Sequence, residues 1–350
     1  LKIDMNRRMA MAFRSCKLNH RIFLFTFVLF LFLTLANAGS VTAGTGTLTN
    51  TLKFTEPNAI VDQGGRHIRI VKPFQRIISL YGAHTENLFA LGLDTEIIGV
   101  TRHEVYPDAA LKKPTFSYRD DPEKFLAAKP DLVLIRPMID RGYPQFVKRL
   151  ELSGITVASL QPNGMADLFT YWRILGALTG RENRSAWMVD TFNRTLEMYH
   201  ELNSGLPRIK KRVYFEAIHS TMKTFSPGSM AIFALETAGG KNMADDARPR
   251  RGTHIAVFGK EQILSRGASI DVFLAQVGTM NRVSVEMIAT EPGFQAIRAV
   301  RNGAVYLIDE LIVSRPTLRL LHGIYEIGHI LYPDIYIQEI AKIISETLDG

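Results

Sequence analysis

The stretch that most constrains this chain is residues 181–204, which contains neither glycine nor proline. Its apolar residues recur every three or four positions, the spacing of one helical face: Met188, Val189, Phe192, Leu196, Tyr199 and Leu202. Gly205 and Pro207 follow, and both residue types commonly end helices. At 1.5 Å per residue the predicted helix is roughly 35 Å long. It is therefore either an ordinary surface helix or a brace between two domains.

The sequence on both sides favours the brace, because apolar runs alternate with helical patterns before and after it. Strands are expected at 76–80, 97–100, 131–135, 155–160, 212–218, 270–275 and 304–308. Between them, helices are expected at 85–93, from Pro122 onward, and at 145–153, 230–238, 260–265, 295–300 and 318–331. Thr85 is the expected N-cap of the first helix and Asp121 that of the second. A small hairpin is expected at 59–71, with its turn at 63–66.

Strands that are apolar throughout and alternate with helices predict parallel sheets covered on both faces. We therefore predict an α/β fold of two Rossmann-like lobes with parallel sheets, joined by a single long α-helix. The first lobe would span residues 59–180, the linker helix 181–205 and the second lobe 206–350. Such lobes can hold a ligand at the carboxyl ends of their strands.

Residues 1–38 are typical of a signal peptide. A basic segment precedes the apolar run 22–35, and Ala36, Asn37 and Ala38 form a small-x-small cleavage pattern. A transmembrane anchor is the alternative, but the run is shorter than the roughly 20 residues a span needs. Residues 39–58 are expected to be a flexible leader. We therefore expect secretion to the periplasm through a cleavable signal peptide.

The position of the single cysteine and the distribution of charge exclude several classes of function. The only cysteine, Cys16, precedes the apolar run, so the mature chain would have no disulfide, no thiolate metal site and no lipid-anchoring cysteine. The formal net charge is +8, but the first 38 residues hold six basic residues and one acidic residue. The remainder therefore carries only +3, which argues against nucleic-acid binding. We expect a monomer that needs no cofactor.

Several short motifs follow one another along residues 59–335: Val61–Arg66, Arg76–Leu80, Thr85–Leu93, Ile98–Val100, Lys129–Ile135, Ser226–Gly228, Leu235–Asn242, Ala299–Leu307 and Arg315–Pro316. Together they resemble the ABC-importer substrate-binding proteins for iron–siderophores, haem and vitamin B12. That family has two α/β lobes joined by one long helix, in agreement with the independent interpretation of 181–204. The chain departs from the family pattern at Leu80–Gly82, in the basic segment 245–258 and at Gly267–Ile270, which leaves the ligand open.

The resemblance implies that one exposed glutamate on each lobe docks on arginines of a membrane permease. By motif these are Glu123 and Glu236. Exposed carboxylates suit this role because they set orientation and encounter rate. The alternative for each is a solvated charge at a helix end, and Glu123 would also favour the N-terminal end of its helix dipole.

The ligand would lie between the lobes. The candidates are residues that follow strand ends, Tyr81, Arg102, Tyr118, Arg136 and Arg251, together with Arg315 in a late loop. Arginines suit a bulky anionic ferric siderophore because guanidinium groups make paired hydrogen bonds to oxyanions. Any single arginine can equally be a surface charge. Tyr118 lies near the position where haem-binding relatives carry an iron-ligating tyrosine, so haem is the second candidate, with Tyr118 as its axial ligand.

Other assignments stay open. Cobalamin, simple metal ions and oxyanions are further ligands that the same fold could carry. His84, His103, Tyr106 and His254 match no metal-ligand spacing, so we predict no protein metal site. No catalytic constellation is found, and we expect no enzyme activity. The rival is a chelatase-like or nitrogenase-like enzyme on a similar two-lobe fold. The favoured hypothesis is a periplasmic protein that delivers an iron complex to an ABC transporter permease.

Overall fold

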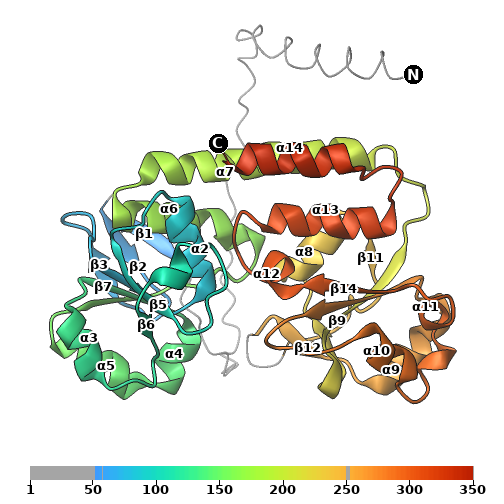
Figure 1. Ribbon diagram of the computed structural model, residues 1–350, viewed down its shortest axis with the longest axis horizontal. Coiled ribbons are helices and arrows are strands. Elements are labelled where there is room, and N and C mark those ends of the chain that lie inside the picture. The colour runs from blue at the N-terminus through green and yellow to red at the C-terminus, as the bar shows by residue number, and fades with distance from the viewer. Residues whose placement is uncertain (1–51, 57, 250–252, 350) are drawn as a thin grey trace, which may run out of the picture. The chain divides into compact units, whose positions relative to one another are not determined.

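The computed structural model describes residues 52–56, 58–249 and 253–349. The predicted signal peptide, most of the leader and Arg251 lie outside these residues. The described residues belong to one compact unit that contains two α/β lobes (Figure 1). Across the described residues, no helix combines the length and the apolar character that crossing a membrane requires.

The chain enters the first lobe through a three-stranded antiparallel sheet of β1 (Lys53–Glu56), β2 (Ala59–Val61) and β3 (His67–Arg69). The hairpin between β2 and β3 was predicted, and its turn contains Gly65 at φ 81°, which glycine adopts without strain. The buried carboxylate of Asp62 accepts a 2.8 Å bond from the backbone of Ser159 and so ties this turn to the lobe. β1 was not predicted, because it lies in the stretch expected to be a flexible leader.

The first lobe contains a parallel sheet in the order β6-β5-β4-β7-β8. Its strands are β4 (Ile77–Ser79), β5 (Ile97–Thr101), β6 (Thr115–Phe116), β7 (Leu132–Ile135) and β8 (Thr156–Ser159). The helices of this lobe are α2 (Gly82–Ala90), α3 (Pro122–Ala128), α4 (Pro137–Gly142), α5 (Pro144–Leu152) and α6 (Met165–Thr179). The apolar β7 is buried at every residue, which confirms the interpretation of a strand covered on both faces.

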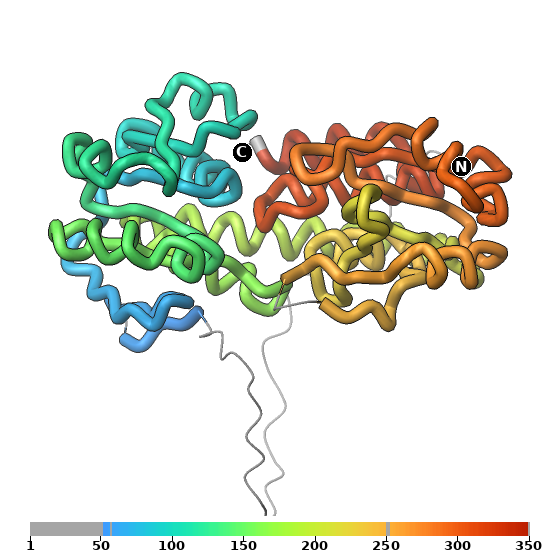
Figure 2. Tube along the Cα trace, turned by 90° about the horizontal axis from the view of Figure 1, so that it is seen from below, coloured from blue at the N-terminus to red at the C-terminus, as the bar shows by residue number. Residues whose placement is uncertain are grey.

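The predicted linker helix is α7 (Glu182–Asn203), which runs from one lobe to the other (Figures 1 and 2). Its Phe192 packs against Trp172 of α6, with ring centroids 5.4 Å apart, and against Phe233 of α8 (Met230–Thr237), at 6.5 Å. Further along, the Tyr199 hydroxyl donates a 2.6 Å bond to Leu321 O in the second lobe. The buried face of α7 therefore contacts both lobes, as a brace requires.

The second lobe contains a mixed sheet in the order β12-β10-β9-β13-β14, with β11 also paired to β9. Its strands are β9 (Arg212–Ile218), β10 (Lys223–Phe225), β11 (Lys241–Asn242), β12 (Ile255–Val257), β13 (Val272–Val277) and β14 (Val305–Asp309). β9, β13 and β14 are parallel, but β10 is antiparallel to both of its neighbours. A wholly parallel sheet was therefore wrong for this lobe, because the short turn after β9 makes a hairpin.

Further helices cover the second lobe: α9 (Lys260–Arg266), α10 (Val285–Thr290), α11 (Arg298–Arg301), α12 (Glu310–Val313), α13 (Leu320–Leu331) and α14 (Gln338–Asp349). The two lobes share one local device. Asp131, just before β7, accepts a 2.8 Å bond from the backbone N–H of Arg76, and Asp271, before β13, accepts one of 2.8 Å from Arg212. In each lobe an aspartate thus joins the starts of two adjacent parallel strands.

Candidate ligand-binding site and docking surfaces

Two of the predicted ligand residues meet where neighbouring strands of the first lobe end. Tyr81 follows β4 and Arg136 follows β7, and these strands pair in parallel. The Arg136 guanidinium carbon lies 4.4 Å from the centre of the Tyr81 ring, a cation–π contact. Burial raises the pKa of the Tyr81 phenol, so this group stays neutral near pH 7.

A third predicted residue, Arg315, reaches this point from the second lobe. It lies in the segment 314–319, between α12 and α13, which Figure 1 places beside α2. Its Nη1 donates a 2.5 Å bond to Oε1 of Glu86, a buried carboxylate of α2. The guanidinium also packs against Gly82, where an added Cβ would lie 2.5 Å from Nη1. The structure thus brings Tyr81, Arg136 and Arg315 together.

Glu86 has a second partner, Arg319, which the sequence analysis did not single out. Nε of Arg319 lies 2.9 Å from Oε2 of Glu86, and its Nη2 lies 2.9 Å from Oε1, a bidentate pair. The Arg319 guanidinium also stacks 4.1 Å from the centre of the Tyr106 ring. We call Arg136, Arg315 and Arg319, together with Glu86, the arginine cluster.

Buried polar atoms without a partner concentrate around this cluster. Within the described residues, nine buried side-chain nitrogen or oxygen atoms have no hydrogen-bond partner, and four lie in or beside the cluster: Asn87 Oδ1, Glu104 Oε2, Arg136 Nε and Thr317 Oγ1. Such atoms cost free energy unless something binds them. Burial also raises the pKa of Glu104, whose other oxygen accepts a bond from Thr85. The arrangement fits a site that receives a polar ligand.

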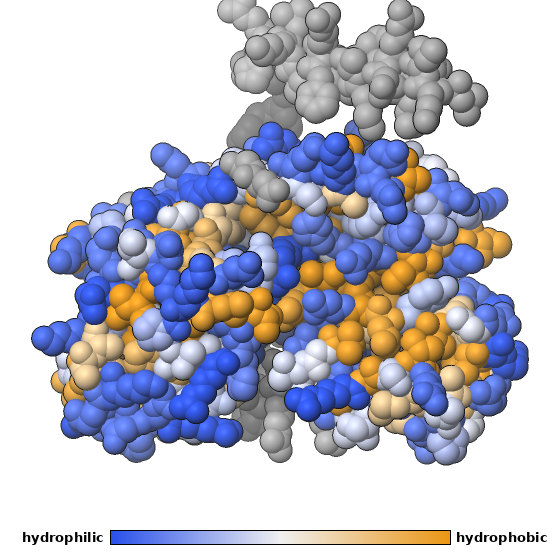
Figure 3. All heavy atoms as spheres, in the orientation of Figure 1, coloured by the Kyte–Doolittle hydropathy of each residue, from blue (hydrophilic) through white to orange (hydrophobic). Residues whose placement is uncertain are grey.

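Exposed apolar side chains also follow strands of both lobes. Val105, which follows β5, is 54% exposed, and Met280, which follows β13 in the second lobe, is 56% exposed. On the face drawn in Figure 3, hydrophobic side chains gather across the middle of both lobes. Charged groups at the strand ends and apolar groups beside them would suit a ligand that has both characters.

The remaining predicted ligand residues do not join the cluster through any described contact. Arg102 is 58% exposed and pairs with Asp120 at 2.5 Å. Tyr118 packs on Tyr143, with ring centroids 4.6 Å apart. Arg251 lies outside the described residues. Thr85, the predicted cap, instead lies inside α2, whose N-cap is Tyr81.

The histidines considered in the sequence lie in different surroundings. His84 is fully buried and bonded to Tyr171 and Ile135, and burial lowers its pKa to about 3. His103 is exposed, and burial lowers the pKa of His254. Among the described residues, no three His, Cys, Asp or Glu side chains are grouped so that they could hold a metal ion.

The two predicted docking glutamates both lie on the surface. Glu123 is in the first turn of α3, where Asp121 caps the helix as predicted, and it pairs with Arg149 at 2.9 Å. The Glu123 side chain is 63% exposed. Glu236 lies near the end of α8 and lines a hollow of about 380 Å³ with Lys210, Lys241 and Asp245. Both carboxylates can therefore reach a partner, although basic residues already stand beside them.

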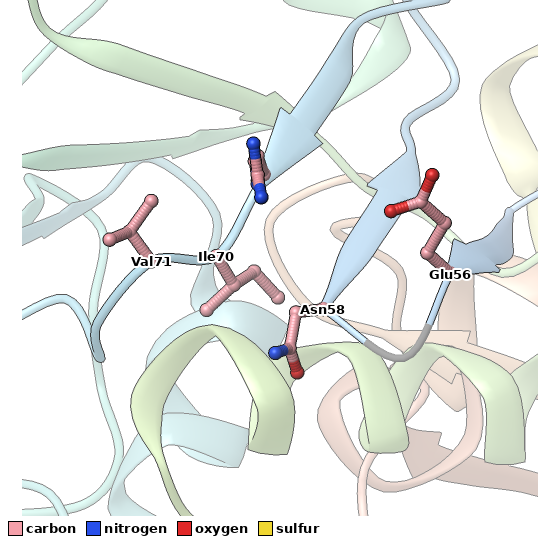
Figure 4. Close-up of a pocket in the computed structure, with 5 residues that line it drawn as sticks. Glu56, Asn58, Ile70 and Val71 are labelled. Atoms are coloured by element: carbon pink, nitrogen blue, oxygen red, sulfur yellow. The ribbon is translucent and has the colours of Figure 1, made fainter.

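A second hollow, of about 350 Å³, lies beside the antiparallel sheet and is lined by Glu56, Asn58, Arg69, Ile70 and Val71 (Figure 4). None of the predicted ligand or docking residues lines it. It is therefore not part of the candidate site.

The sequence profile of the periplasmic binding proteins matches residues 77–311, more than half of the chain. The chain belongs to the periplasmic binding protein family. Members of this family are solute-binding proteins, and the match includes α7 and parts of both lobes.

Individual relatives have low sequence identity to this chain, but the matched segments are long. YvrC of Bacillus subtilis, an uncharacterized ABC transporter substrate-binding lipoprotein, is 24% identical over 284 residues, 80% of this chain and 87% of that protein. The vitamin B12-binding protein of Salmonella choleraesuis is 27% identical over 211 residues, 59% of this chain and 75% of that protein. These relatives support the family assignment and leave the ligand open.

Solved structures show the same fold. A possible iron-binding periplasmic solute-binding protein from Staphylococcus epidermidis superimposes with a TM-score of 0.64 at 28% identity, covering 75% of this chain and 100% of that one. The haem-binding protein RhuT from Roseiflexus gives 0.63 at 21% identity, covering 75% and 99%. The second likeness concerns the fold alone.

Proposed function

We propose that this chain is the solute-binding component of an ABC importer and that it carries an iron complex, most favourably a ferric siderophore, to the permease. The observation that carries the proposal is the arginine cluster beside Tyr81. It brings cationic groups of both lobes to the strand ends of an α/β fold, where such sheets bind ligands. A solved relative named as a possible iron-binding protein, and relatives named as haem-binding and vitamin B12-binding proteins, support the same class.

Delivery of the ligand to the permease would depend on the two surface carboxylates. Glu123 and Glu236 would contact arginines of the permease, one from each lobe, and so orient the loaded protein on it. Arg149 would then exchange its place on Glu123 with a permease arginine. The ligand leaves unchanged, because the protein's part is recognition and transfer.

Haem and cobalamin are the alternative ligands of the same site. Curated relatives named vitamin B12-binding proteins favour cobalamin, and solved haem-binding relatives favour haem. For haem, the Tyr118 phenol would be the axial ligand. In each case the protein would act in the periplasm, after export through residues 1–38.

One absorption experiment tests which ligand the protein binds. Residues 39–350, purified without ligand, would be incubated in parallel with a ferric siderophore, haemin and cobalamin, then desalted. A ferric charge-transfer band that co-elutes with the protein in stoichiometric amount is the expected result. A sharp Soret band lost on Tyr118→Phe would replace the siderophore with haem, and retained cobalamin absorption would replace it with cobalamin. Retention of none of the three would refute the proposed function.

A further inference from the structure

We propose that Glu86 is a built-in counter-ion that sets the net charge of the candidate ligand-binding site, and that the ligand presents an anionic group to the arginines around it. This inference rests on the proposed function, because it concerns the same site. It assigns Glu86 and Arg319 as specificity-determining residues. Neither was identified from the sequence.

The arginine cluster holds more guanidinium groups than paired carboxylates. One carboxylate, Glu86, faces two guanidinium groups, those of Arg315 and Arg319. No carboxylate within the described residues pairs with Arg136. Three guanidinium groups therefore meet one carboxylate that is paired with them. Glu104, the other acid nearby, is buried, and burial favours its neutral form.

Some guanidinium N–H groups of the cluster make no described hydrogen bond. Arg315 uses only Nη1 on Glu86, so its Nε and Nη2 make no described hydrogen bond. Nε of Arg136 is buried and has no partner among the described residues. A carboxylate, hydroxamate or catecholate oxygen is the kind of acceptor that such donors bind most strongly. The unused donors and the excess positive charge thus point to one class of ligand group.

The ion pairs of Glu86 with Arg315 and Arg319 are largely buried. The side chain of Glu86 is 3% exposed, and those of Arg315 and Arg319 are 16% and 18% exposed. Water screens such charges much less than surface charges. A change of one charge at Glu86 or Arg319 should therefore alter the affinity for an anionic ligand strongly and that for a neutral ligand weakly.

The test uses pairs of probes that differ by charge: a neutral ferric trihydroxamate and its derivative with one added carboxylate, haemin dimethyl ester and haemin, and cobalamin and its monocarboxylate. Affinities are measured by fluorescence titration for the wild type, E86Q, R319Q and the double variant. The quantity compared is the preference for the charged member of the pair. E86Q should raise this preference about tenfold, and R319Q should lower it about tenfold. A tenfold change corresponds to a coupling energy near the low end of those measured between close charges.

The double variant separates charge from structural damage. It restores the net charge, so its preference should return to within about threefold of wild type. If Glu86 and Arg319 had only a structural role, each substitution would lower the affinity for both probes of a pair alike. The double variant would then bind both probes more weakly than either single variant. Glu96→Gln is the matched control, because Glu96 of the first lobe pairs with Arg181, outside the cluster. It should leave the preference unchanged.

The outcomes distinguish the two proposals. If the wild type retains no probe pair, the proposed function fails and this inference falls with it. If it retains a pair but E86Q and R319Q do not shift the preference in opposite directions, only the inference is overturned. Thermal unfolding of each variant identifies one that has not folded, and the Arg319→Lys variant, which keeps the charge, should then hold the preference near wild type.

Discussion

The phenolic oxygen of Tyr171 lies 2.7 Å from Nδ1 of His84, and both side chains are fully buried. Nε2 of His84 lies 3.2 Å from Ile135 O, which can only accept, so Nε2 carries the proton and Nδ1 accepts from Tyr171. Asn87 donates to the same phenolic oxygen at 3.2 Å and to Pro316 O at 3.0 Å. Hydrogen bonds therefore connect the backbone beside Arg136 with the backbone beside Arg315.

This relationship predicts the effect of Tyr171→Phe. The variant removes one hydroxyl but leaves Nδ1 of His84 and one amide hydrogen of Asn87 with fewer partners in a buried place. The free energy of unfolding should fall by about 1–3 kcal/mol, the usual cost of unsatisfied buried polar groups. Urea-induced unfolding, followed by circular dichroism, measures it.

The matched control is Tyr306→Phe, because Tyr306 is 39% exposed and its hydroxyl can bond to water. It should change the free energy of unfolding by less than about 0.5 kcal/mol. An equal effect of the two variants would show that the buried hydroxyl contributes nothing specific.

The same histidine predicts a pH dependence of stability. Burial lowers the pKa of His84 to about 3 in the folded chain, whereas an unfolded histidine titrates near 6.5. Between these values the unfolded chain binds a proton that the folded chain does not, so the free energy of unfolding falls as pH falls. In His84→Gln this contribution is absent, and stability should decline less steeply below pH 6.5, by up to about 1.4 kcal/mol per pH unit.

Unfolding curves of both proteins at pH 7, 6, 5 and 4 provide the comparison. Glu216 raises the pKa of His219 by a hydrogen bond, and burial raises the pKa of Glu216. Both shifts act with the opposite sign, since they favour the folded state at lower pH, but they are common to the two proteins and cancel in the difference. Parallel stability curves would contradict the prediction.

Much of the fold could be predicted because its signals are local. The apolar period of 181–204, the cap at Asp121 and the apolar run of β9 each depend on neighbouring residues in the sequence. α6 was missed although it forms a full helix, Met165–Thr179, because it is apolar on most sides and shows no clear period. The hairpin of β9 and β10 was missed because its turn has no typical turn pair.

The site was only partly predictable because it is made by distant parts of the chain. Tyr81, Arg136 and Arg315 were found from their positions after strands or in a motif. Glu86 lies within a helical motif, where its charge resembles that of a surface residue, and only the fold shows it buried against Arg315 and Arg319. Arg319 follows Arg315 by four residues, and that spacing was the one signal that could have suggested a pair.

The docking proposal predicts the behaviour of the double variant Glu123→Ala/Glu236→Ala. Both side chains are exposed and lie outside the arginine cluster, so the ligand affinity should stay within about twofold of wild type. Uptake by cells that keep the cognate permease but lack the native binding protein should be abolished, because the loaded protein no longer seats on it.

A double variant of the exposed α7 residues Glu197 and Glu201 to alanine is the control for loss of surface negative charge. It should support uptake like the wild type. Loss of ligand binding in the Glu123/Glu236 variant, or unchanged uptake, would count against docking through these residues.

The close approach of Gly82 to Arg315 yields the last prediction. In Gly82→Ala the added Cβ would lie 2.5–2.7 Å from the Arg315 guanidinium, so this side chain must shift, and we expect the shift to weaken its bond to Glu86. Alanine in a helix is otherwise about 1 kcal/mol more favourable than glycine. In the wild-type background, loss of the buried pair should outweigh this gain and lower the free energy of unfolding by about 1 kcal/mol. In an Arg315→Ala background nothing is displaced, and the same substitution should raise it by about 0.5–1 kcal/mol. Urea unfolding of the four proteins measures this reversal of sign, and equal effects in both backgrounds would mean that Gly82 does not position Arg315.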